Sequence, residues 1–119
     1  MGVYQCGRNI DGIAEYTGGQ VVSIFTLEES TYDIRSTDYI IHVVYTITGP
    51  VTSLTLPLAQ SRAGRVIIVK DAGGNAGSNN ITVDTEGSET IDGDDVWVIN
   101  GDYDWVVFYS NGLNWFLMG

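Results

Sequence analysis

The feature that most constrains the fold is a series of short apolar segments separated by turns rich in glycine and asparagine. These segments favour strands because they are rich in β-branched and aromatic residues, and each has the usual strand length of about five to seven residues. They are Gln20–Thr26, Tyr39–Tyr45, Thr52–Leu58, Gly64–Lys70, Asn80–Asp84, Val96–Asn100, Trp105–Ser110 and Asn114–Met118. The sequence therefore predicts an all-β fold.

The connections between these segments carry residues that suit tight turns. Asp92-Gly93, Asn100-Gly101 and Asn111-Gly112 are pairs that tolerate positive φ, as two-residue hairpins require. A longer loop, Gly73–Gly77, leads into another strand-like run rather than into the helix of a nucleotide site, and we interpret it as a long hairpin turn. Short strands joined in this way predict a small antiparallel sandwich, barrel or prism.

The first residues of the chain differ from the rest. Residues 1–19 contain five glycines and show neither a helical nor a two-residue period. We therefore predict a short irregular N-terminal arm over 1–19, followed by a single all-β domain over 20–119. A length of 119 residues suits one domain with a modest core.

Charge and hydropathy restrict the possible partners. The formal net charge is −10, with five basic residues against fifteen acidic ones. Because a surface of this sign repels nucleic acids and anionic membranes, we expect neither as a partner. We also expect no membrane insertion and no secretory signal, because no segment has the roughly 18 apolar residues of a spanning helix and no basic-then-apolar leader is present.

The sequence offers no convincing catalytic centre. Cys6 and His42 are the only residues of their kinds, and His42 lies inside an apolar run. One cysteine forms no intrachain disulfide, which fits a reducing cytoplasm. A catalytic cysteine needs a base beside it, and nothing in the sequence pairs these two residues. We predict no catalytic residues and no enzyme.

Carboxylates crowd one segment that contains no lysine or arginine. They are Asp84, Glu86, Glu89, Asp92, Asp94, Asp95, Asp102 and Asp104. Close carboxylates suit Ca²⁺ and, in pairs, glycoside hydrolysis, but Val96 and Trp97 occupy positions where an EF-hand needs a ligand and a glycine. We interpret the cluster as solvated turns, assign no metal or cofactor residues, and leave cation binding open.

An ordered set of motifs runs from Leu54 to the end of the chain. It consists of LTLP (54–57), GRVIIVKD (64–71), GNA (74–76), NNITV (79–83), ETIDG (89–93), FYSNG (108–112) and NW (114–115). Over roughly residues 39–119 this order and spacing resembles β-rich modules of tailed-phage tail fibres, head fibres and virion decoration proteins. The resemblance implies a non-enzymatic virion structural module, commonly trimeric, that decorates the particle or contacts a host surface.

This resemblance sets the expected partners and location. We expect a homotrimer on the virion, assembled in the host cytoplasm, with residues 1–19 attaching to capsid or tail proteins and a host glycan or receptor as a further partner. Tyr39–Tyr45 and Trp105–Trp115 carry more apolar side chains than one sheet face needs, which predicts subunit contacts there.

A carbohydrate-binding module is the alternative function. Such a module needs a shallow aromatic patch flanked by amides. Trp97, Trp105, Asn111 and Asn114 are the candidates for that patch, although aromatic residues at strand spacing more often belong to a core or a subunit interface.

Overall fold

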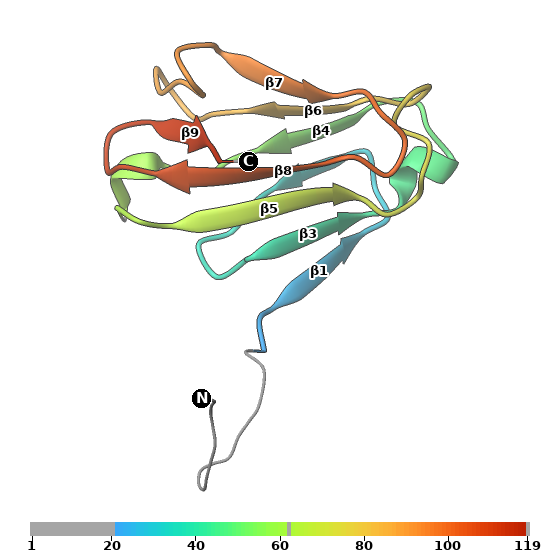
Figure 1. Ribbon diagram of the computed structural model, residues 1–119, viewed down its shortest axis with the longest axis horizontal. Helices are drawn as coiled ribbons and strands as arrows, with labels where there is room; N and C mark the ends of the chain where they lie inside the picture. The colour runs from blue at the N-terminus through green and yellow to red at the C-terminus, as the bar shows by residue number, and fades with distance from the viewer. Residues whose placement is uncertain (1–20, 62, 119) are drawn as a thin grey trace, which may run out of the picture.

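The structure, a computed structural model, describes residues 21–61 and 63–118, which form two β-sheets packed face to face (Figure 1). The strands are β1 (Ile24–Leu27), β2 (Thr31–Asp33), β3 (Ile40–Val43), β4 (Thr52–Thr55), β5 (Val66–Asp71), β6 (Ile81–Asp84), β7 (Val96–Ile99), β8 (Trp105–Ser110) and β9 (Trp115–Leu117). Two short 3₁₀ turns, η1 (Tyr45–Ile47) and η2 (Ala59–Ser61), complete the elements. The all-β prediction is confirmed for the described residues, and the predicted arm over 1–19 lies outside them.

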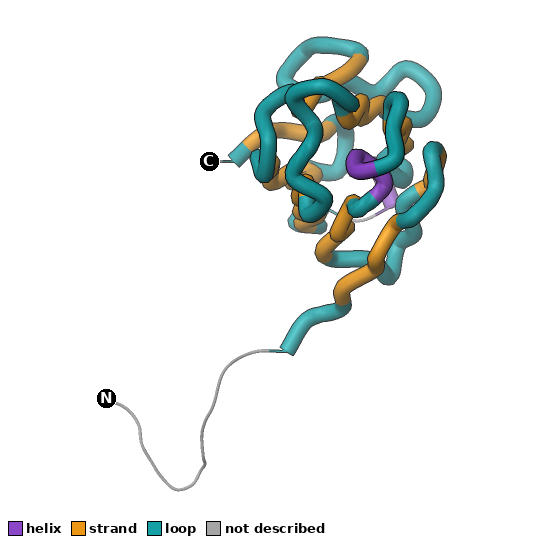
Figure 2. Tube along the Cα trace, turned by 90° about the vertical axis from the view of Figure 1, so that its right-hand side faces the viewer, coloured by secondary structure: helices purple, strands orange, loops and turns teal. Residues whose placement is uncertain are grey.

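The chain alternates between the two sheets through its first six strands. The five-stranded sheet has the order β1-β3-β5-β8-β9, and the four-stranded sheet has the order β2-β4-β6-β7. Up to β6, each strand pairs in parallel with the strand two places earlier in the chain. β7, β8 and β9 then close the sheets with antiparallel pairings. Figure 2 looks toward an end of the sandwich at which connecting loops gather.

A two-sheet sandwich was among the predicted architectures, but antiparallel pairing throughout was wrong. The turn residues between the early strands lead across to the opposite sheet instead of back along the same one. The Gly73–Gly77 loop shows the difference, because it joins β5 in one sheet to β6 in the other and is no hairpin. Asn111-Gly112 does turn between two neighbouring antiparallel strands, β8 and β9, as predicted.

Side chains alternate between the core and the surface along the strands. In β5, Ile67 and Val69 are fully buried, while Val66, Ile68 and Lys70 are only half-buried. The buried hydrophobic residues are Leu27, Ile34, Ile41, Val43, Leu54, Leu56, Ala59, Ile67, Val69, Ala76, Ile81, Val83, Ile91, Ile99, Phe108 and Trp115. Burial of each larger aliphatic side chain contributes about 1.5–3 kcal/mol, so this layer between the sheets is the main stabilising element of the fold.

Candidate functional site

A buried carboxylate organises the loops at one end of the sandwich. Asp71, the last residue of β5, accepts hydrogen bonds at Oδ1 from Thr46 Oγ1 (2.6 Å) and the Gly74 amide (3.0 Å). Its Oδ2 accepts from the amides of Ala76 (2.9 Å) and Tyr103 (2.9 Å). Burial raises the pKa of Asp71, but these four hydrogen bonds outweigh it and lower the pKa below its ordinary value. The ionised carboxylate therefore fixes the loops around residues 73–77 and 100–104.

The acidic residues of the second half lie in several separate connections, except Asp84, which is the last residue of β6. Glu89 accepts the Ala59 amide with both carboxylate oxygens (2.8 and 3.0 Å), and Asp92 Oδ1 accepts the Leu117 amide (3.1 Å). Asp102 Oδ1 accepts the Gly77 amide (2.8 Å). Among the described residues, no three His, Cys, Asp or Glu side chains gather where a metal ion could be held. The hydrogen bonds give these three carboxylates roles in shaping loops.

The outward face of the five-stranded sheet is apolar. We call it the outer apolar face and define it by the outward residues Ile24, Thr26, Ile40, His42, Val66, Ile68, Lys70, Trp105, Val107, Tyr109 and Phe116, together with Met118. The register places Ile24, Ile40, Ile68 and Val107 in one row across four strands. Tyr109 and Phe116 stack beside this row, with ring centroids 5.7 Å apart.

No carboxylate belongs to the outer apolar face. The outward face of the four-stranded sheet differs, because it carries hydroxyl groups and two acidic residues, Asp33 and Asp84, beside the exposed Val96 and Val98 of β7. The two outward faces of the sandwich therefore have different chemistry. The sequence analysis considered Cys6 and His42 as a catalytic pair. His42 lies on the outer apolar face between Thr26 and Lys70, and Cys6 lies outside the described residues.

A slot opens between the edge strand β7 and the start of β8. It has a volume of about 400 Å³ and is lined by Trp97, Val98, Ile99, Asn100, Asp104, Trp105, Val106, Val107, Leu117 and Met118. We call it the tryptophan slot. It exists because β9 ends at Leu117 and leaves the start of β8 uncovered. Trp97 packs against the core, whereas Trp105 is 47% exposed.

The structure brings together half of the residues proposed for carbohydrate binding. Trp97 and Trp105 line the same slot, but Asn111 and Asn114 lie beyond the opposite end of β8. Asn111 Oδ1 accepts the Leu113 and Asn114 amides (3.0 and 2.9 Å), so it shapes its own turn. Asn114 Oδ1 accepts the Thr90 amide (3.0 Å).

The polar residues that do accompany the tryptophans are Asn100 and Asp104, which sequence reasoning missed. Their position at the two ends of the short connection from β7 to β8 was the available signal.

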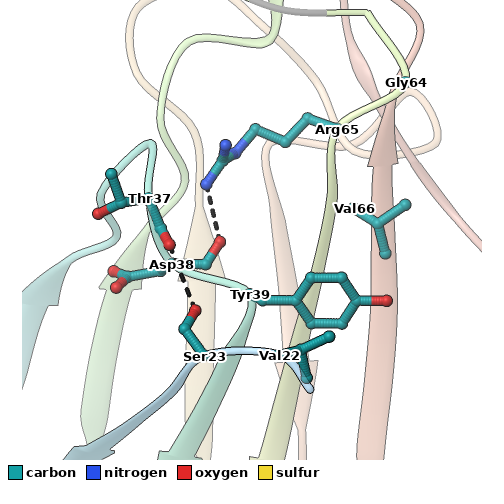
Figure 3. A pocket seen from close by; sticks show the side chains of 8 residues that line it. All are labelled: Val22, Ser23, Thr37, Asp38, Tyr39, Gly64, Arg65 and Val66. Carbon is teal, nitrogen blue, oxygen red and sulfur yellow. Dashed lines mark hydrogen bonds between the residues drawn. The ribbon is translucent and has the colours of Figure 1, made fainter. Parts of the chain in front are cut away.

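A second hollow, of about 410 Å³, lies where the loop before β3 meets the start of β5 (Figure 3). Figure 3 shows Arg65 reaching toward this loop, where its Nη2 donates to the backbone oxygens of Arg35 (3.0 Å) and Asp38 (2.7 Å). Ser23 Oγ donates to the Thr37 oxygen (3.3 Å). These hydrogen bonds fix the position of the loop before β3. The residues around this hollow therefore have a structural role.

Asp38 continues this network on the other side of the loop. Its Oδ2 accepts from the Tyr32 hydroxyl (2.6 Å) and the Arg35 amide (2.8 Å). Burial, followed by the hydrogen bond to Asp38, raises the pKa of Tyr32 to about 12. Tyr32 also stacks on Phe25, with centroids 4.3 Å apart. These contacts join β1 to β2, the edge strands of the two sheets.

Comparison with known proteins finds no family model that matches the chain and no significant match among curated proteins. Within residues 21–61 and 63–118, no helix is long and apolar enough to cross a membrane.

Proposed function

We propose that the chain is a non-enzymatic structural subunit of a virus particle, which associates with further copies of itself through the outer apolar face. The ordered motifs between Leu54 and Trp115 support the virion role, through their resemblance to phage fibre and decoration modules. The single observation that carries the self-association is the absence of carboxylates from one complete sheet face in a chain of net charge −10.

The distribution of charge supports a second copy as the occupant of this face. Copies of a strongly acidic chain repel one another, and the repulsion is weakest where no carboxylate is brought close to another. The row from Ile24 to Val107 supplies apolar surface there, and contiguous apolar surface on an outward face is typical of an interaction site. Ile24 in this row is 60% exposed and Met118 on the same face is 48% exposed in the single chain, so the outer apolar face has surface left to bury.

The remaining parts of the proposal follow from the resemblance. The assembly is a homotrimer on the virion, formed in the host cytoplasm, and residues 1–19 attach it to a capsid or tail protein. The polypeptide enters the five-stranded sheet at its edge strand β1, so the arm precedes an edge of the outer apolar face. The part of each subunit that faces away from the capsid or tail protein is then available to contact a host surface.

Light scattering coupled to gel filtration tests the self-association. We expect the wild-type chain to elute at three times the chain mass at micromolar concentration. Ile68→Glu places a carboxylate at the outward position of the central strand β5, and it should shift the protein to the monomer. Thr82→Glu adds the same charge on the outward face of the four-stranded sheet and should leave the trimer intact.

Far-UV circular dichroism shows whether Ile68→Glu still folds, and Val107→Glu on β8 provides a second outward variant if it does not. A monomeric wild-type protein at this concentration would refute self-association. Dissociation by Thr82→Glu but not by Ile68→Glu would assign the interface to the other sheet.

A further inference from the structure

The three tryptophans of the chain have different environments. Trp115 is fully buried, and its Nε1 donates to the Pro57 oxygen (3.0 Å). Trp97 and Trp105 line the tryptophan slot, and neither indole N–H donates to any described residue. Neither nitrogen is among the buried polar atoms that lack a partner, so both indole N–H groups are open to solvent and available to donate to a ligand that brings acceptor oxygens.

Acceptor and amide groups stand at the same slot. The Asn100 side chain forms no hydrogen bond with the described residues. Asp104 Oδ1 accepts the Trp105 amide (2.9 Å), while no described group donates to its Oδ2. The slot therefore offers a carboxylate acceptor, an amide and two indole donors, placed next to the apolar side chains of Val106 and Leu117.

The backbone beside the slot is held in place by Asp71. The Asp71 amide donates to the Asp104 oxygen (2.9 Å), and Asp71 Oδ2 accepts the Tyr103 amide (2.9 Å). The Asp104 amide donates to the Gly101 oxygen (3.1 Å) and closes the connection between β7 and β8. A site whose backbone is already fixed loses less entropy when a ligand binds.

We propose that the tryptophan slot binds a neutral mono- or disaccharide. A sugar ring combines an apolar C–H face, which suits an indole, with hydroxyl groups that donate to a carboxylate and exchange hydrogen bonds with an amide. The volume of about 400 Å³ lies within the usual range of small-molecule sites, about 300–1,000 Å³. This inference goes beyond the structural role proposed above. The slot shares Trp105, Val107 and Met118 with the outer apolar face, so sugar binding by the assembled protein requires that this margin of the face stays uncovered.

Two other ligand classes fit the slot less well. An anionic sugar or a phosphate would face Asp104, and none of the described residues that line the slot carries a positive charge. A purely apolar ligand would cover Asn100 and Asp104 and leave their polar atoms without partners, which costs binding free energy. Neutrality and hydroxyl groups are therefore the properties that the slot selects.

Nuclear magnetic resonance of the indole N–H groups tests this proposal in the full chain. The probes are the methyl glycosides of glucose, galactose and mannose and free N-acetylglucosamine, with glucuronate as the anionic comparison. We expect at least one neutral probe to shift the Trp97 and Trp105 signals along a saturable curve and to leave Trp115 in place. Single Trp→Phe variants assign the three signals.

Variants separate binding at the slot from general effects of sugar on the protein. Asp104→Asn removes a charged hydrogen-bond acceptor and should weaken binding by about tenfold or more, whereas Asp95→Asn, outside the slot, should not change it. The proposal is overturned if no neutral probe moves the two signals at high millimolar concentration, if Trp115 moves equally, or if glucuronate binds as tightly as the neutral sugars. The indole signals report on the slot alone. A negative result for sugar binding would therefore not change the interpretation of the light-scattering measurement of oligomeric state.

Discussion

At the scale of single residues, Asp71 joins the loops at one end of the sandwich through its buried carboxylate. In the sequence it ends an apolar run and begins a glycine-rich loop, as many loop aspartates do. The structure shows a fully buried carboxylate with four donors from three loops. Two of those donors, Thr46 and Tyr103, lie far from Asp71 along the sequence. A local sequence pattern therefore cannot predict these contacts.

Asp71→Asn should lower the free energy of unfolding by about 3 kcal/mol at neutral pH, because an amide replaces an ionised acceptor and turns a donor group toward backbone N–H groups. Urea denaturation measures the change. Asp95→Asn, at an exposed position, is the matched control and should change the stability by less than about 0.5 kcal/mol.

The difference in unfolding free energy between the wild type and Asp71→Asn should also depend on pH. Because the pKa of Asp71 is lower in the folded chain than in the unfolded chain, its stabilising effect is present above the unfolded value of about 3.9 and is lost as the pH falls through the folded value. The gap in unfolding free energy between wild type and Asp71→Asn should therefore narrow below about pH 4. A gap that stays constant into acid would show that ionisation of Asp71 is irrelevant to stability.

At the scale of elements, periodicity located the strands but did not determine their partners. All eight predicted segments overlap an observed strand. β2 was missed because it has three residues, of which only Tyr32 packs against the core. The parallel pairing was missed because Gly- and Asn-rich turns have the same composition whether the chain returns within one sheet or crosses to the other.

The same limit applies to the candidate site. The aromatic pattern identified Trp97 and Trp105, but their polar neighbours depended on which end of β8 faces the slot. Asn111 and Asn114 were the amides predicted to flank the tryptophans, whereas the antiparallel path of β8 carries these amides away from the slot and places Asn100 and Asp104 beside it.

Ser110 ties the end of β8 to η2, and its removal should weaken that connection. Its buried hydroxyl donates to the Ala59 oxygen (2.6 Å) and accepts the Gly112 amide (3.0 Å). Ser110→Ala leaves both groups unpaired and should cost about 2 kcal/mol of unfolding free energy. Ser61 Oγ also donates over 2.6 Å, to Leu58, but at an exposed site, so Ser61→Ala should cost less than about 0.5 kcal/mol. Equal losses in the two variants would contradict the role of burial.

At the scale of the whole molecule, the sandwich has two outward faces that differ in charge. The four-stranded sheet turns hydroxyl groups, Asp33 and Asp84 outward, while the outer apolar face has no carboxylate. The sequence predicted an excess of apolar side chains in Tyr39–Tyr45 and Trp105–Trp115. The strands in both segments belong to the five-stranded sheet. A self-associating subunit requires this division, because one face must approach a copy while the other remains in water.

Intermolecular nuclear Overhauser effects in a mixture of differently labelled copies test the central claim most directly. Self-association through the outer apolar face predicts contacts between copies from the methyl groups of Ile40, Ile68 and Val107, and none from Val96 and Val98 on the four-stranded sheet. Contacts that involve only Val96 and Val98, or no contacts between copies at all, would contradict the assignment of this face as the subunit interface.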